Sequence, residues 1–185
     1  SYNYLSPEYL VTLGLAFICF VVGFVMIYIW KKKKQNRSTL IWALSLIFLS
    51  LSYFHRNMAI TNDFNFLNLH KSTLGTFRWL FFSLAMIGFY YGVMRLICRR
   101  KLWRVYFPVL YFLIFFFLSL FREQIFDSAR NFILVYFSAY VGPLSLIIAL
   151  IFIILYGVLH AENSRNNYGS LIIGLAWLII AIRNF

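Results

Sequence analysis

Acidic side chains are scarce in this chain and absent from its apolar segments. The 185 residues include five Asp and Glu against 17 Lys and Arg, for a formal net charge of +12. The acidic residues lie in the N-terminal arm or in the connections, and they are Glu8, Asp63, Glu123, Asp127 and Glu162. A carboxylate at membrane depth is the usual mark of a proton relay or a cation site. The sequence therefore argues against both kinds of site.

Groups that could hold a metal or a cofactor are also few. Cys19 and Cys98 have no spacing that suggests a redox pair or a metal site. His55 and His70 flank the same connection, whereas His160 ends a different apolar run, so a pair of opposed haem ligands is not expected. There is no HExxH motif and no Gly-rich phosphate loop. We therefore predict a protein that is not an enzyme, with no catalytic residue, metal or cofactor.

The chain is instead rich in long apolar runs. Apolar residues make up 63% of it, and the mean hydropathy is +0.80. At roughly 20 residues per crossing, about six crossings fit. The sequence predicts an all-α integral membrane protein, a single domain over residues 1–185 with N-terminus outside. The predicted spans are 9–30, 39–54, 74–98, 105–121, 132–159 and 168–182.

Basic residues set the predicted orientation. The connection from Lys31 to Arg37 carries five of them and the connection from Arg99 to Arg104 carries four. Basic connections stay on the cytoplasmic side or its equivalent, so the first and third connections are expected there. Because the charges cluster at the ends of apolar runs, nucleic-acid binding is not expected. The membrane itself, cell membrane or mitochondrial inner membrane, is left open.

The same residues predict contact with lipid. A basic surface at the ends of spans attracts anionic headgroups such as cardiolipin. The residues expected to form it are Lys31, Lys32, Lys33, Lys34, Arg95, Arg99, Arg100, Lys101 and Arg104. Arg78 is expected to extend its charged end to the headgroups.

Small residues mark helix faces that pack closely. Gly88 and Gly92 lie four apart, on one face of the third predicted span, and would let a neighbouring backbone approach. That neighbour is expected to be a helix of the same chain, and a contact with another chain is the alternative. A similar set in the fifth span is Ser138, Gly142 and Ser145. Serines within spans, Ser45 of the second among them, are expected to bond back to their own helix.

The fourth and fifth predicted spans each contain one proline. Pro108 is expected in the first turn of the fourth span, where a missing N–H is tolerated. Pro143 follows Gly142 about 11 residues into the fifth predicted span and is the expected kink. Tryptophans near span ends, such as Trp42 and Trp79, fit an interfacial belt.

The leading functional prediction is a non-catalytic polytopic subunit that packs with other integral membrane subunits. Its complex would be an energy-transducing or translocating one, in which this chain is accessory or structural. A first alternative is a sensor input module, because the layout is similar to prokaryotic seven-span sensory modules; a seventh span and an effector would then follow Phe185. A second alternative is a carrier for an apolar or anionic small molecule that uses Arg78 and the Pro143 kink.

Overall fold

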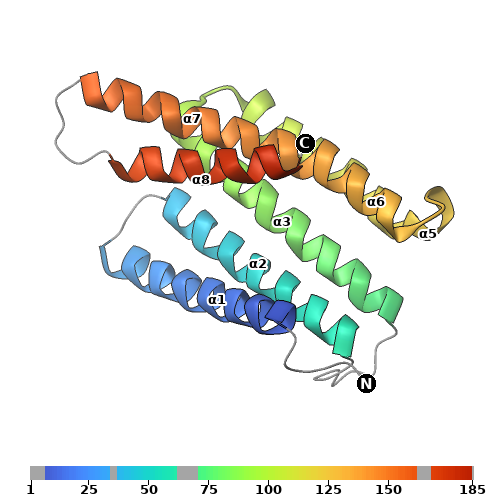
Figure 1. The fold of residues 1–185 in the computed structure, drawn as a ribbon. Helices are drawn as coiled ribbons and strands as arrows, with labels where there is room; N and C mark the ends of the chain where they lie inside the picture. The colour runs from blue at the N-terminus through green and yellow to red at the C-terminus, as the bar shows by residue number, and fades with distance from the viewer. Residues whose placement is uncertain (1–6, 34–36, 62–70, 162–167, 185) are drawn as a thin grey trace. The chain divides into compact units, whose positions relative to one another are not determined.

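The computed structural model describes residues 7–33, 37–61, 71–161 and 168–184, and every regular element in these ranges is a helix. Figure 1 shows them in order. The elements are α1 (Pro7–Lys33), α2 (Arg37–Thr61), α3 (Lys71–Ile97), η1 (Leu102–Tyr106), α4 (Phe107–Leu120), α5 (Arg122–Ile125), α6 (Ala129–Tyr136), η2 (Phe137–Val141), α7 (Gly142–Ala161) and α8 (Tyr168–Asn184). The two η elements are π-helical turns.

Five helical segments are long and apolar enough to cross a membrane. They are Tyr9–Lys33, Arg37–Met58, Thr73–Ile97, Leu102–Leu120 and Ala129–Val158. The apolar part of α8, Ser170–Ile182, is shorter than these five. The predicted all-α, multi-pass membrane architecture is therefore confirmed, and the sixth crossing stays a prediction.

The helices group into two compact units, and the single domain over residues 1–185 stays a prediction. Unit 1 is Ser1–Leu120, with α1 to α4, and unit 2 is Phe121–Phe185, with α5 to α8. Each unit is built mainly from helices that follow one another in the chain, because short connections favour packing between sequence neighbours.

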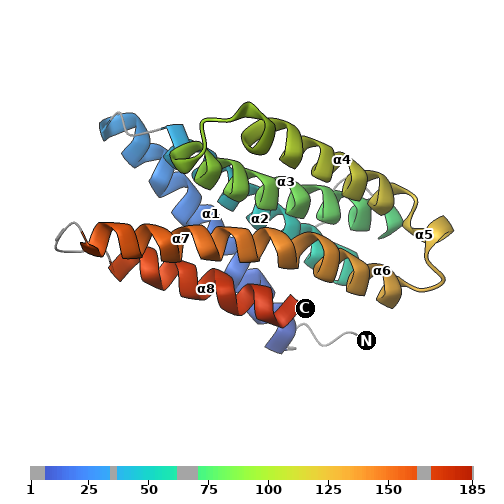
Figure 2. The ribbon, with the colours of Figure 1, turned by 90° about the horizontal axis from the view of Figure 1, so that it is seen from above.

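In unit 1, α2 packs against both α1 and α3, and α3 packs against α4 (Figures 1 and 2). Consecutive helices run antiparallel. Gly23, late in α1, lies against Ala43, early in α2, and Gly92, late in α3, lies against Trp42. The C-terminal ends of α1 and α3 therefore lie at the same end of unit 1.

The second predicted span, 39–54, was expected to gain a turn at either end. The helix that contains it, α2, runs from Arg37 to Thr61 and passes the predicted start of the connection at His55. The polar side chains of this last part find partners inside unit 1. His55 Nδ1 lies 2.8 Å from the Leu51 carbonyl oxygen, and the Asn57 side chain accepts a hydrogen bond from Thr12. The Thr12–Asn57 hydrogen bond joins the end of α2 to α1 beyond the apolar run.

Each π-helical turn ends two residues before a proline. The Phe107 N–H donates to Leu102 O just before Pro108, and the Gly142 N–H donates to Phe137 O just before Pro143. Within an α-helix the proline ring clashes with the carbonyl four residues earlier, and the wider π turn relieves this crowding. The helical segment that contains the fourth predicted span therefore begins at Leu102, with η1, and Pro108 is the second residue of α4, in its first turn.

Unit 2 contains one continuous helical path from α6 through η2 to α7, with α8 packed against α7. The path begins at Ala129, three residues before the predicted start at Phe132. Ser128 is its N-cap, and the serine Oγ accepts a hydrogen bond from the Asn131 N–H at 3.2 Å. This cap satisfies one of the donors that every helix start leaves open, which is why the helix begins there.

Candidate functional site

The Gly88 and Gly92 face of α3 lies against α2. A Cβ added at Gly88 would overlap the Ser45 hydroxyl, and one added at Gly92 would overlap the Trp42 indole. The glycines thus give two α2 side chains room to lie on the α3 backbone. Trp42 packs within unit 1 at this contact, a position that the interfacial-belt prediction did not indicate.

Two further close contacts involve glycines of α1 and α8. A Cβ at Gly23 of α1 would lie 2.9 Å from Ile47 Cγ1 and 3.0 Å from the Ala43 carbonyl oxygen. A Cβ at Gly174 of α8 would lie 2.9 Å from Ile153 Cγ1. Gly23 lacks a second glycine four residues away, so the usual pattern did not reveal it.

The small residues predicted in the fifth span do not share one environment. Gly142 and Ser145 are buried, whereas Ser138 is exposed and its hydroxyl donates to the Leu134 carbonyl oxygen of its own helix at 2.7 Å. The π turn just before Gly142 changes the helical register between Ser138 and Ser145. Residues spaced seven apart in sequence therefore fall on different faces.

Polar side chains in the spans of unit 1 join neighbouring helices. The Ser50 hydroxyl of α2 donates to the Ala16 carbonyl oxygen of α1 at 2.7 Å. On the other side of α2, the Ser52 hydroxyl donates to the Arg78 carbonyl oxygen of α3 at 3.0 Å. Own-helix bonding was expected for such serines, and for these two the expectation is wrong. Ser45 does bond back, to Ile41 O at 2.8 Å.

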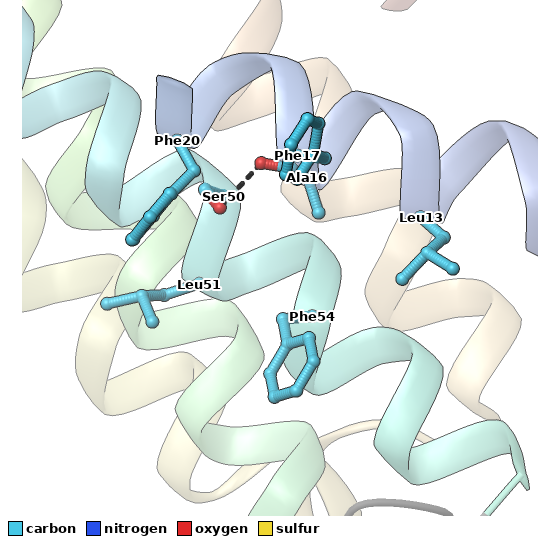
Figure 3. A pocket seen from close by; sticks show the side chains of 7 residues that line it. All are labelled: Leu13, Ala16, Phe17, Phe20, Ser50, Leu51 and Phe54. Atoms are coloured by element: carbon cyan, nitrogen blue, oxygen red, sulfur yellow. Dashed lines mark hydrogen bonds between the residues drawn. The ribbon is translucent and has the colours of Figure 1, made fainter. Parts of the chain in front are cut away.

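An apolar groove of about 340 Å³ lies between α1 and α2 (Figure 3). We call it the α1–α2 groove. Its lining residues are Leu13, Ala16, Phe17, Phe20, Ser50, Leu51 and Phe54. In Figure 3 the Ser50 hydroxyl points at the α1 backbone, and this bond ties the two helices together beside the groove.

The antiparallel arrangement brings the two predicted basic clusters to one end of unit 1. Lys31, Lys32 and Lys33 are exposed in the last turn of α1, and Arg99, Arg100 and Lys101 are exposed just beyond α3. Arg95 and Arg104 are half-buried, and Lys34 lies outside the described residues. We call the described members of this set the basic end.

Arg78 and Arg104 are half-buried arginines near the ends of spans. The Arg78 guanidinium carbon lies 4.6 Å from the centre of the Trp79 ring, a cation–π distance. The Arg104 Nε is buried and has no hydrogen-bond partner among the described residues.

Carboxylates with described side chains lie on the surface. Glu123 has a side chain that is 71% exposed, 3.5 Å from Arg122, and Asp127 is also exposed. The side chains of Glu8, Asp63 and Glu162 lie outside the description. Within the described ranges, no three His, Cys, Asp or Glu side chains gather as a metal site would require.

Comparison with known proteins returned no match. No family model, curated protein or solved structure corresponds to this chain. Its function is therefore argued from its own residues.

Proposed function

We propose that this chain is a non-catalytic, multi-pass membrane subunit that packs within a larger membrane protein complex. It would be an accessory or structural part of an energy-transducing or translocating assembly. The observation that carries the proposal is the use of polar side chains in the spans of unit 1. Ser50 and Ser52 fasten α2 to the backbones of α1 and α3, and Thr12 pairs with Asn57. These groups stabilise helix contacts and do not converge on a reaction centre.

The outward surface of α1 supports a packing role. No charged residue lies between Tyr9 and Trp30, and one side of this stretch exposes a continuous apolar surface. Its exposed residues include Val11, Ile18, Val22 and Val25. Such a surface is suited to lipid tails or to a helix of another subunit, since van der Waals packing drives association within membranes.

The basic end supports a second part of the proposal, contact with anionic lipid. Exposed lysines and arginines from two connections sit at one end of unit 1. Each such side chain near a negatively charged membrane surface contributes about 1 kcal/mol. We infer that this end faces the cytoplasmic or equivalent side, that the N-terminus lies opposite, and that α8 forms a sixth crossing.

Co-purification tests the proposal. The tagged full chain is extracted from its native membrane in a mild detergent after brief chemical cross-linking. We expect at least one other integral membrane protein to co-elute at fixed stoichiometry. An unrelated tagged multi-pass protein of similar hydropathy controls for non-specific co-extraction. Elution as a stable monomer without any partner would overturn the proposal.

A further inference from the structure

We propose that the backbone carbonyl oxygen of Ser138, in η2, accepts a hydrogen bond from a side-chain hydroxyl on a helix of another membrane subunit. This inference rests on the proposed function, because it names the point at which a partner subunit contacts unit 2. The backbone of the two π turns, the depth of Ser138 in its span and the surface around it support the inference.

The Ser138 carbonyl has lost both of its backbone donors. In an α-helix it would accept from the Gly142 N–H, but this N–H donates to Phe137 O in the π turn. The next residue, Pro143, has no N–H. No side chain in the described ranges donates to this oxygen, and the Ser138 hydroxyl donates to Leu134 O at 2.7 Å. The carbonyl is therefore an open acceptor.

The first π turn shows how this chain fills such a gap. Trp103 is the second residue of η1, as Ser138 is of η2, and one residue separates each turn from a proline. The Trp103 carbonyl has lost the same two donors, and the Tyr90 hydroxyl of the neighbouring helix α3 donates to it at 3.2 Å. A carbonyl in this position is thus within reach of a hydroxyl from a packed helix. Among the described residues the equivalent donor for Ser138 is missing.

The depth of Ser138 favours a protein donor over water. Ser138 lies six residues after Phe132, where the apolar run begins, and this is about 9 Å along a helix axis at 1.5 Å per residue. It belongs to the segment Ala129–Val158, which is long and apolar enough to cross a membrane. An unsatisfied backbone group is costly at membrane depth, and a neighbouring helix is one of the few sources of a donor there.

The surface around Ser138 indicates which donor fits. Leu134 and Val135, about one turn before it, are exposed, and so is Ala139 beside it. The run from residue 132 to 159 contains no charged residue, so a cationic donor would be buried here without a counter-charge. The hydroxyl of Ser, Thr or Tyr on an otherwise apolar helix avoids that cost. We therefore infer a neutral, hydroxyl-bearing span as the occupant.

Substitution of the two prolines tests the proposal in the full chain. Pro143→Ala supplies a backbone N–H for Ser138 O, so the partner's hydroxyl loses its open acceptor. We expect this variant to retain the co-eluting subunit about threefold less than the original chain does, the scale of one interhelical hydrogen bond in a membrane. Pro108→Ala is the matched control, because Tyr90 of the same chain already serves the equivalent carbonyl, and it should leave retention unchanged.

Photo-cross-linking in the native membrane identifies the donor. Benzoylphenylalanine is placed at Leu134, which is 58% exposed and one turn from Ser138. We expect an adduct with an apolar span of the same co-eluting subunit, close to a Ser, Thr or Tyr. Replacing that residue by its counterpart without the hydroxyl should lower retention about threefold with the original chain and leave it unchanged with Pro143→Ala. The first half of this comparison uses the original chain, so it decides the matter even if Pro143→Ala fails to fold.

The outcomes that contradict the proposal are distinct from those that contradict the proposed function. Equal retention of the subunit by Pro143→Ala and the original chain would overturn the hydrogen bond and leave the proposed function standing. Elution of the original chain with no partner would overturn both. Adducts at position 134 with lipid alone, with residues 1–120 of the same chain or with a second copy of it would mean that another subunit does not cover Ser138.

Discussion

The Tyr90 hydroxyl donates a hydrogen bond to the Trp103 carbonyl oxygen at 3.2 Å. In an α-helix that carbonyl would accept from the Phe107 N–H, but this N–H donates to Leu102 O in the π turn. The next backbone donor along the chain would be residue 108, which is a proline and has none. Tyr90, on the neighbouring helix, therefore supplies the donor that the proline removes.

We expect Tyr90→Phe to lower the free energy of unfolding by about 1 kcal/mol, because it leaves the Trp103 carbonyl unsatisfied. In a Pro108→Ala background the loss should shrink, since a backbone donor becomes available there. Thermal unfolding in detergent for all four combinations of the two substitutions measures this coupling. Additive losses would mean that Tyr90 and Pro108 act independently.

The glycine face of α3 predicts a second outcome. Gly88→Ala should destabilise unit 1 by about 1–3 kcal/mol, because the new Cβ overlaps the Ser45 hydroxyl. Adding Ser45→Ala should recover part of the loss. Gly14→Ala is the matched control, because a Cβ there meets nothing within 4 Å, and it should be neutral or stabilising. Equal effects of Gly88→Ala and Gly14→Ala in the unfolding assay would contradict the close contact.

In unit 2 we expect Gly174→Ala to weaken the packing of α8 on α7. The added Cβ would lie 3.2 Å from the Ala149 carbonyl oxygen, which is backbone and cannot rotate away. Limited proteolysis in detergent micelles should cut α8 faster in this variant than in the original chain. Gly157→Ala, on α7 with nothing within 4 Å of the new Cβ, provides the control. Unchanged cleavage in Gly174→Ala would argue against this contact.

The predicted orientation can be read by cysteine accessibility in sealed vesicles. With Cys19 and Cys98 replaced by alanine, single cysteines are placed at Lys32, Lys101 or Gln124. Lys32 and Lys101 belong to the basic end and should react from the same side, whereas Gln124 should react from the opposite side. Gln124 lies beyond α4, which crosses once between it and Lys101. Reaction of all three from one side would refute the topology.

The basic end predicts a dependence on anionic lipid. Changing Arg99, Arg100 and Lys101 to glutamine should reduce enrichment of cardiolipin around the protein, because each charge contributes about 1 kcal/mol near an anionic surface. Native mass spectrometry after extraction from mixed cardiolipin and phosphatidylcholine vesicles measures the retained lipid. Gln124→Ala is the control, because Gln124 lies outside the basic end, and this variant should retain cardiolipin as the original chain does. Equal retention in both variants would mean that these charges are not a lipid site.

Much of the fold follows from local sequence. Whether a segment can cross a membrane depends on how apolar it is over about 20 residues, and this can be read directly from the sequence. The shared face of Gly88 and Gly92 follows from the helical period alone. The end of the first apolar run at Trp30 likewise follows from the four adjacent lysines, Lys31–Lys34, that come after it.

Partners far apart in the chain were decided only by tertiary structure. Thr12 and Asn57 lie 45 residues apart, and their hydrogen bond joins α1 to the part of α2 beyond its apolar run. Ser50 bonds across to Ala16 although its own helix offers a carbonyl one turn away. Such choices depend on where a second helix places its backbone, and a one-dimensional pattern does not contain that position. The sequence by itself determined the helices, the apolar segments and their charged ends. The helix contacts, the Tyr90–Trp103 hydrogen bond and the α1–α2 groove depend instead on which helices pack against one another in three dimensions.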